Sequence, residues 1–474
     1  MQSGLLSILM PVYNEEEYVG TILERVISAP LPDGLMREII VVDDGSTDDS
    51  AAVVENVVRN HPGLVHLIRL ESNRGKGAAV RRAIVEARGE FSIIQDADLE
   101  YNPHEYGLIL RPLLDDVADA VYGSRFASSA RRRVLYFWHS VANRVLTTLC
   151  NVAADLNLTD VETCYKAFRT SLLKTIPIRS DRFGIEPEIT IKLAKRQARI
   201  YEVPISYEGR TYEDGKKVGA VDAFEAVWVI LRNWITRDLY TDSGAEILDE
   251  FAATPRFNRW MADTIAPYVG RRVLEIGAGM GNLSRQLSRR RERYIATDID
   301  IEHLRRLRSR LHHRPNLEAA ICDLSNPEHF RSLGSAVDTV ICLNVLEHIE
   351  DDLTALGSMR DALEPGGRAI ILVPHGQELF GRLDEVLGHY RRYSHQQLAG
   401  RIREAGLHVE KILDFNRISR PGWYLKSRVL GRPRVGRFSL LIFEHSVWLW
   451  RKIDRFLPWG PTSIIAIARK EGSQ

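Results

Sequence analysis

Three acidic residues follow an apolar run in the stretch "IIQDADLEY", which covers residues 93–101. Carboxylates placed this close repel one another, so a nearby cation would explain why they are gathered. Alternation along an extended strand would put Asp96, Asp98 and Glu100 on the same side. Oxygen ligands in that pattern suit a hard divalent cation that bridges a diphosphate. The stretch therefore predicts a Mg²⁺ or Mn²⁺ site, with acids of a solvated turn as the alternative.

A glycine-rich stretch, "LEIGAGMGN", offers a second place for chemistry. Gly277, Gly279 and Gly281 stand between an expected strand and an expected helix, where glycines let the backbone approach a ligand. Asp298 follows at the end of the next strand-like run, about twenty residues on, which is the spacing for a ribose hydroxyl. The pattern indicates a nucleotide-type cofactor.

The elements that must position these residues alternate between strand-like and helix-like segments, which predicts an α/β fold with parallel sheets. Open sheets of that class bind ligands beyond the carboxyl ends of their strands, where both groups of acids stand. A chain of 474 residues is too long to fold around one ordinary hydrophobic core, so we expect more than one domain. A polar segment between two α/β series predicts domains at residues 1–235 and 251–474, joined by a linker at 236–250.

The composition excludes several classes of protein. A formal net charge of +1 supplies no overall field for binding nucleic acid. The four cysteines are widely spaced and form no C-x-x-C, which is typical of a reducing cytosol. No stretch reaches ~18 uninterrupted apolar residues, so we expect no transmembrane helix. The sequence predicts a cytoplasmic protein without a nucleic-acid partner.

Five motifs occur in order in the first half: "MPVYNEEE", "VVDDGSTDDS", "NRGKGAAVR", "QDADLEY" and "YGSRF". Residues 7–235 thereby resemble the family 2 glycosyltransferases of GT-A fold, above all the branch of dolichyl-phosphate mannosyltransferases and polyprenyl-phosphate glycosyltransferases. The resemblance implies a UDP- or GDP-sugar donor bound by Pro11, Tyr13, Glu15, Asp44 and Lys76. It implies that Asp96, Asp98 and Glu100 face the metal and the diphosphate. It also implies that Arg125 meets an acceptor phosphate, while Arg210 and Lys216 close over the donor diphosphate.

The acceptor remains open between a phosphate and a sugar hydroxyl. A phosphate is already anionic near neutral pH and needs cations to position it, whereas a hydroxyl needs a base, for which Asp160 or Glu186 are candidates. Apolar residues recur at helical spacing in "RRRVLYFWHSVANRVLTTLCNVAADL", after three arginines. Such a helix can lie in an anionic membrane interface, which favours a lipid phosphate, or it can be an ordinary buried helix.

The second half resembles the class I S-adenosylmethionine-dependent methyltransferases. The resemblance rests on "LEIGAGMGN", "ATDID", "AAICDLSN", "VDTVICLNVLEHIEDD" and "LEPGGRAIILVPHG". It implies that S-adenosylmethionine is bound by Glu275, Gly277, Gly279, Gly281, Asp298, Asp323 and Asn344. Leu346 and Glu347 would then line the pocket beside the methyl group, and His348, His375, His389 or Tyr390 could act as a base or orient the acceptor.

Together these features predict a bifunctional enzyme. The first domain would transfer a sugar, with inversion, to a polyprenyl phosphate, and the second would methylate a related glycan or lipid-linked product. The alternative is transfer to a sugar hydroxyl of a cell-surface glycan that the second domain caps. A peripheral position at the inner face of the membrane is compatible with either acceptor.

Overall fold

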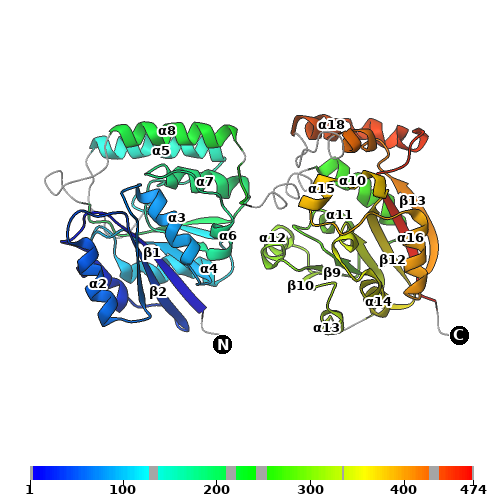
Figure 1. Ribbon diagram of the computed structural model, residues 1–474, viewed down its shortest axis with the longest axis horizontal. Coiled ribbons are helices and arrows are strands. Elements are labelled where there is room, and N and C mark those ends of the chain that lie inside the picture. Colours follow the sequence, from blue (N-terminus) through cyan, green and yellow to red (C-terminus); the bar gives the residue numbers. More distant parts are fainter. Residues whose placement is uncertain are drawn as a thin grey trace. The chain divides into compact units, whose positions relative to one another are not determined.

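The chain divides into two compact units, residues 1–241 and residues 242–474, and each is described by itself (Figure 1). The computed structural model describes residues 4–127, 137–209, 220–236, 238–241, 254–333, 336–425 and 437–471. Each unit is built on one seven-stranded sheet with accompanying helices. The predicted α/β class is confirmed for both units.

The sheet of the first unit has the strand order β3-β2-β1-β4-β6-β5-β7. Its strands are β1 (Gly4–Val12), β2 (Leu35–Asp43), β3 (Val65–Arg69), β4 (Phe91–Ile94), β5 (Ala120–Ser124), β6 (Lys166–Arg169) and β7 (Ile200–Pro204). Strands β3, β2, β1 and β4 are parallel, whereas β6 is antiparallel to both β4 and β5. The sheet is therefore mixed rather than parallel. Strand β6 begins at the edge where β5 ends, since Tyr122 pairs with Lys166.

Helices of the first unit connect these strands. They are α1 (Val19–Ser28), α2 (Ser50–Asn60), α3 (Lys76–Glu86), α4 (Tyr106–Leu114), α5 (Phe137–Ala154), α6 (Thr170–Lys174), α7 (Ile185–Lys195) and α8 (Ala220–Ile235), with a 3-10 turn η1 (Pro103–Glu105). Helix α3 packs on β1 and β2, and α4 packs on β5 and β6. Helices α5 and α8 lie side by side along one end of the unit (Figure 1).

The sheet of the second unit has the order β10-β9-β8-β11-β12-β14-β13. Its strands are β8 (Arg272–Ile276), β9 (Arg293–Asp298), β10 (Leu317–Ile321), β11 (Val337–Leu343), β12 (Leu363–Pro374), β13 (His408–Phe415) and β14 (Ser463–Arg469). Strand β14, which comes from the stretch "TSIIAIARK", is antiparallel to its neighbours β12 and β13. Phe415 pairs with Ser463, so β14 also begins where the preceding strand ends.

The helices of the second unit are α10 (Pro255–Ile265), α11 (Ser284–Leu287), α12 (Ile301–Leu311), α13 (Pro327–Ser332), α14 (Asp352–Ala362), α15 (Arg382–Val386), α16 (His395–Glu404), α17 (Arg420–Trp423) and α18 (Arg437–Ile453). Its 3-10 turns are η2 (Ala266–Tyr268), η3 (Leu346–His348), η4 (Gln377–Leu379) and η6 (Asp454–Phe456). Within the described parts of the chain, no helix combines the length and the apolar character needed to cross a bilayer.

Candidate active sites

The carboxyl ends of β1 and β2 bring the first candidate residues of the first unit together. Because the strands are parallel and Pro11 pairs with Val42, the residues after both strands meet at one sheet edge. The carboxylate of Asp44 accepts hydrogen bonds from the backbone N–H groups of Arg74 (2.9 Å) and Gly75 (2.7 Å). Asp44 thus clamps the loop that carries Lys76 against the end of β2.

The loop after β1, which holds Tyr13 and Glu15, is tied to the loop after β2. The backbone N–H of Glu15 donates to Oγ of Ser50 at 2.7 Å, and the backbone N–H of Thr47 donates to Oδ1 of Asn14 at 2.8 Å. Pro11, Tyr13, Glu15 and Asp44 therefore occupy one edge of the sheet, as a nucleotide pocket requires.

Lys76 lies between two carboxylates. Its Nζ is 3.0 Å from Oδ1 of Asp96 and 3.0 Å from Oε1 of Glu186, and all three side chains are largely withdrawn from solvent. Burial by itself would lower the pKa of Lys76, but the two carboxylates outweigh it and hold that pKa well above its usual value. Lys76 is therefore a fixed cation beside the predicted metal ligands. No sequence motif indicated that Glu186 would be its second partner.

The acids of "DADLE" follow strand β4 rather than extending it. Strand β4 ends at Ile94, so Asp96, Asp98 and Glu100 stand in a turn, and strand alternation does not place them on one side. Oε2 of Glu100 accepts a hydrogen bond from the hydroxyl of Tyr207 at 2.8 Å, and Oδ1 of Asp98 accepts one from the backbone N–H of Glu100. Among described residues, these acids do not form a set of three ligand atoms within 4.8 Å.

Arg125 follows strand β5 and forms a two-bond ion pair with Asp160. Its Nε lies 2.7 Å from Oδ2 of Asp160, and its Nη2 lies 2.8 Å from Oδ1. Nη2 also donates to Oδ1 of Asn143 on α5 at 3.2 Å, and the guanidinium lies 5.0 Å from the ring centre of Tyr207. Tyr207 thus touches both Arg125 and Glu100, a link that no sequence motif indicated. Arg210, Lys216 and the arginines at 131–133 lie outside the described residues.

The glycine-rich loop of the second unit follows β8. Gly277, Gly279 and Gly281 all have positive φ angles, and a Cβ at Gly277 would collide with the side chain of Val345. The backbone N–H of Gly279 donates to Oδ2 of Asp298 at 2.8 Å. Asp298, the acid predicted to contact a ribose hydroxyl, thus lies beside the glycine-rich loop at the end of β9.

The pKa values of the two acids at this edge, Glu275 and Asp298, are shifted in opposite directions. Burial raises the pKa of Glu275 to about 7, although Oε2 accepts hydrogen bonds from the hydroxyls of Ser284 and Tyr294 (2.9 Å to Tyr294). Burial also acts on Asp298, but hydrogen bonding and charge from His303 outweigh it and lower the pKa. The carboxylate of Glu275 thus points into the interior, while Asp298 is held ionised at the loop.

The remaining predicted residues of the second unit follow β10 and β11. Oδ1 of Asp323 accepts hydrogen bonds from the backbone N–H and the hydroxyl of Ser325, at 2.8 and 2.6 Å. Asn344 is exposed and has a φ of 56°, and its backbone N–H donates to Leu372 at 2.9 Å. Asn344 therefore stands beyond the carboxyl end of β11, which is next to β8, and Asp323 stands beyond that of β10, two strands from β8 on the other side.

Of the four side chains considered as a base, two lie together. The rings of His348 and His389 have centres 4.7 Å apart, and burial, followed by the charge of His389, lowers the pKa of His348 to about 4. His375 is separate: its Nδ1 lies 2.9 Å from the carbonyl oxygen of Tyr393. Tyr390 is exposed, and its backbone N–H donates to the backbone carbonyl of Glu347 at 2.8 Å.

Comparison with known proteins gives each unit a counterpart. The profile of the family "Glycosyl transferase family 2" matches residues 7–176, and that of the family "Methyltransferase domain" matches residues 274–369. An undecaprenyl-phosphate 4-deoxy-4-formamido-L-arabinose transferase from Edwardsiella ictaluri is 27% identical over 211 residues, which are 44% of this chain and 62% of that protein. A dodecaprenyl-phosphate galacturonate synthase from Rhizobium johnstonii is 26% identical over 45% of this chain and 61% of its own length.

This chain therefore spans less than two thirds of the length of these relatives. Among solved structures, glucosyl-3-phosphoglycerate synthase from Mycobacterium tuberculosis aligns with 48% of this chain and 80% of its own, at 20% identity and a TM-score of 0.39. The family matches agree with both resemblances drawn from the sequence motifs. The chain carries a glycosyltransferase domain of family 2 in its first unit and a methyltransferase domain in its second, and both are families of enzymes.

Proposed function

We propose that the first unit transfers a sugar from a UDP- or GDP-sugar to a polyprenyl phosphate, with inversion at the anomeric carbon and with Mg²⁺ or Mn²⁺. The second unit uses S-adenosylmethionine to methylate a related glycan or lipid-linked product. In the first reaction an oxygen of the lipid phosphate attacks the anomeric carbon, and the bond to the nucleoside diphosphate breaks. A phosphate needs no general base for this step.

The sheet edge of the first unit supports the donor assignment. Asp44, Lys76 and Asp96 come together there from three loops, as a bound nucleotide sugar requires. The carboxylates of Asp96, Asp98 and Glu100 are oxygen donors of the kind that Mg²⁺ and Mn²⁺ take, and the cation would neutralise the diphosphate. Lys76 adds a fixed positive charge at the same edge.

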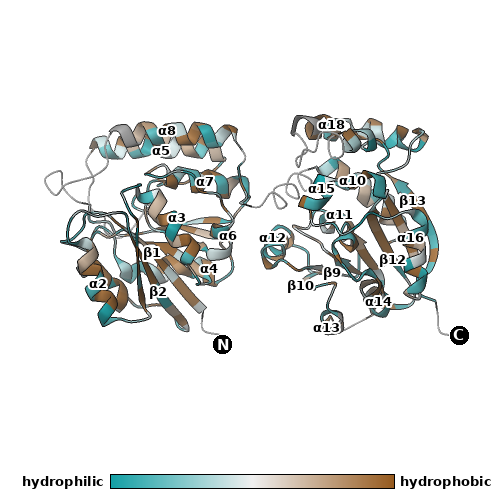
Figure 2. Cartoon of the chain, viewed as in Figure 1, coloured by the Kyte–Doolittle hydropathy of each residue, from teal (hydrophilic) through white to brown (hydrophobic). Residues whose placement is uncertain are grey.

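The observation that carries the acceptor assignment is the exposure of aromatic side chains on α5 and α8. These two helices lie side by side, and each carries hydrophobic residues among hydrophilic ones (Figure 2). Trp138 on α5 is 75% exposed, and Phe224 and Trp228 on α8 are 78% and 66% exposed. Aromatic side chains left in water on adjacent helices mark an interaction surface, and a membrane interface accepts such rings. Arg125 contacts α5 through Asn143, which relates this surface to the predicted phosphate-binding cation.

The alternative acceptor is a sugar hydroxyl, which needs a carboxylate base. Asp160 is fully buried, and both of its oxygens are bonded to Arg125, so it suits an orienting role better than proton abstraction. Glu186 is the remaining candidate. Its Oε1 faces Lys76, and its Oε2 is buried without a hydrogen-bond partner among the described residues. This buried oxygen favours the hydroxyl as acceptor.

For the second unit, the cofactor fits the glycine loop and its neighbours. Gly277, Gly279 and Gly281 adopt positive φ angles and carry no side chain, so a ligand can approach the backbone of this loop closely. Asp298, Asp323 and Asn344 would contact the ribose, the adenine and the methionine side of the pocket. S-adenosylmethionine supplies the methyl group when bound. The inward orientation of Glu275 assigns it to supporting the loop through Ser284.

The test is a transfer assay with the full chain, Mn²⁺ and undecaprenyl phosphate, offered a panel of UDP- and GDP-sugars. Products are identified by mass spectrometry. We expect one lipid-phosphate sugar from the wild type and none from Asp98→Asn, which should still bind S-adenosylmethionine. Asp115→Asn, an exposed acid paired with Arg111 on α4, is the matched control and should keep activity. Metal-dependent donor hydrolysis without a lipid product would refute the lipid phosphate as acceptor.

A further inference from the structure

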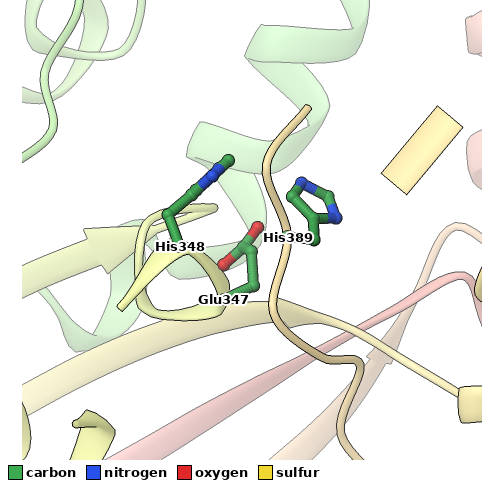
Figure 3. Close-up of side chains that lie close together, drawn as sticks. All are labelled: Glu347, His348 and His389. Atoms are coloured by element: carbon green, nitrogen blue, oxygen red, sulfur yellow. The ribbon is translucent and has the colours of Figure 1, made fainter. Parts of the chain in front are cut away.

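Two loops of the second unit bring a carboxylate and two imidazoles together. Glu347 and His348 belong to the turn η3 after β11, and His389 follows helix α15. One ligand atom from each of these residues lies within 4.8 Å of the other two. Figure 3 shows the carboxylate of Glu347 lying between the two rings. Within the described ranges, no other such group of three histidine, cysteine or acidic side chains occurs.

Glu347 has a buried carboxylate without a hydrogen-bond partner among the described residues. Its side chain is 1% exposed, and neither carboxylate oxygen accepts a hydrogen bond from another described residue. An isolated carboxylate removed from water is costly unless it is paired, neutralised or bound to a metal. The two histidines of the cluster lie within 4.8 Å of it, and the positive charge of Arg392 also acts on it but forms no hydrogen bond with its oxygens. A cation between the three groups would satisfy both orphan oxygens.

His389 has the surroundings of a metal-binding histidine. Its Nδ1 lies 2.9 Å from Oδ1 of Asp384, which is fully buried and also receives Nε of Arg392 at 2.8 Å. Histidines that bind metals commonly donate their other ring N–H to a carboxylate, which fixes the ring and the tautomer. With Nδ1 engaged by Asp384, the nitrogen left for a ligand is Nε2.

The backbone holds both loops in this arrangement. The N–H of Tyr390 donates to the carbonyl of Glu347, so the segment after α15 is fastened to η3. Val345, two residues before Glu347, is the side chain that a Cβ at Gly277 would strike. The cluster therefore stands two residues from a side chain that contacts the glycine-rich loop.

We propose that Glu347, His348 and His389 bind a divalent transition-metal ion. Two imidazoles and one carboxylate suit Zn²⁺, Fe²⁺ or Mn²⁺ and leave coordination positions open for oxygen ligands. The metal orients an oxygen of the methyl acceptor beside the cofactor. This role rests on the proposed methyltransferase function, whereas metal binding itself does not.

The metal site is tested on tag-free full-length protein carrying Asp98→Asn, so that the acids of the first unit do not contribute. The protein is stripped with a chelator and titrated with Zn²⁺ and with Co²⁺ by calorimetry, and the bound metal is counted by elemental mass spectrometry. We expect one equivalent to bind, with a visible Co²⁺ spectrum characteristic of nitrogen and oxygen ligands. Glu347→Gln and His389→Gln should each weaken binding at least about tenfold, as loss of a ligand does.

The matched control is His395→Gln. His395 is also paired with a carboxylate, since its Nε2 lies 2.7 Å from Asp414, but it is outside the cluster. Binding that is absent, or that Glu347→Gln and His389→Gln leave unchanged, would overturn the metal site. S-adenosylmethionine binding is measured in every variant, so failure of the cofactor pocket is recognised separately. Equal methyl transfer by metal-free and metal-loaded protein would overturn the acceptor role.

Discussion

Glu275 should make the second unit less stable as the pH rises, and its replacement by glutamine should remove this effect. The side chain is buried on β8, and its pKa is raised to about 7 from an ordinary value of 4.5. Below pH 4.5 the group is protonated in both the folded and the unfolded chain. Between pH 4.5 and 7 the unfolded chain releases the proton while the folded chain keeps it, so the stability contributed by neutral Glu275 is lost as the pH rises.

The magnitude follows from the size of the shift. Each pKa unit corresponds to about 1.4 kcal/mol, so the loss across this window is about 3 kcal/mol. Glutamine keeps the shape and an acceptor oxygen for Ser284 or Tyr294 but does not titrate. Relative to the wild type, Glu275→Gln should therefore gain about 3 kcal/mol of unfolding free energy between pH 4.5 and pH 8.

The two-unit chain requires a local assay, because unfolding need not be two-state. Urea unfolding at several pH values is read by short deuterium pulses in peptides from β8 and β9. Glu318→Gln on β10 is the control. Arg293 donates to Glu318 and lowers its pKa, so this variant should show no gain with pH. A difference between Glu275→Gln and wild type that stays flat from pH 5 to pH 8 would refute the reasoning.

Other substitutions test the first unit. Lys76→Met should destabilise helix α3 by about 3–5 kcal/mol in hydrogen exchange, because it strands two carboxylates, and adding Glu186→Gln should recover part of the loss. Equal values for the single and double variants would contradict this. Asp160→Asn should raise the KM for the lipid phosphate more than it lowers kcat, whereas a lost base would lower kcat alone. Trp228→Glu should weaken binding to anionic vesicles about tenfold, from about 1.5 kcal/mol of lost apolar burial, and Met36→Glu on β2 should not.

The features that sequence motifs predicted best are those encoded within a short stretch of chain. The glycine-rich stretch lies between a strand and a helix as expected, and Asp298 stands at the end of the next strand, beside Gly279. Strand directions were not encoded in this way. Strands β6 and β14 alternate with helices like the others, yet each returns from the edge where its predecessor ends. The direction of a strand depends on how the preceding segment of chain connects it to its neighbour, and hydrophobic periodicity does not predict this.

Contacts between residues that are distant in sequence were predicted less well. The second carboxylate on Lys76 comes from α7, and the histidine beside Glu347 comes from the segment after α15. Glu186 and His389 were each recognised as chemically capable, but nothing local to either indicates what it faces. The prediction that Asp96, Asp98 and Glu100 lie on one side of a strand was wrong because a local pattern was misleading. Its alternation is that of a strand, while β4 ends at Ile94 before the pattern begins.

The acids at both sheet edges hold the neighbouring loops in place by hydrogen bonds, in addition to any contact that they make with a ligand. Asp44 accepts two backbone N–H groups from the loop of Lys76, and Asp298 accepts one from Gly279 and one from Asp300. A carboxylate has about four acceptor positions, so these bonds leave room for a ribose or a base. Asparagine at either site would keep one acceptor oxygen and leave one N–H without its partner. Loss of ligand affinity in such a variant therefore identifies a ligand contact only if hydrogen exchange of the ligand-free loop is unchanged, because loosening of the loop alone would weaken binding.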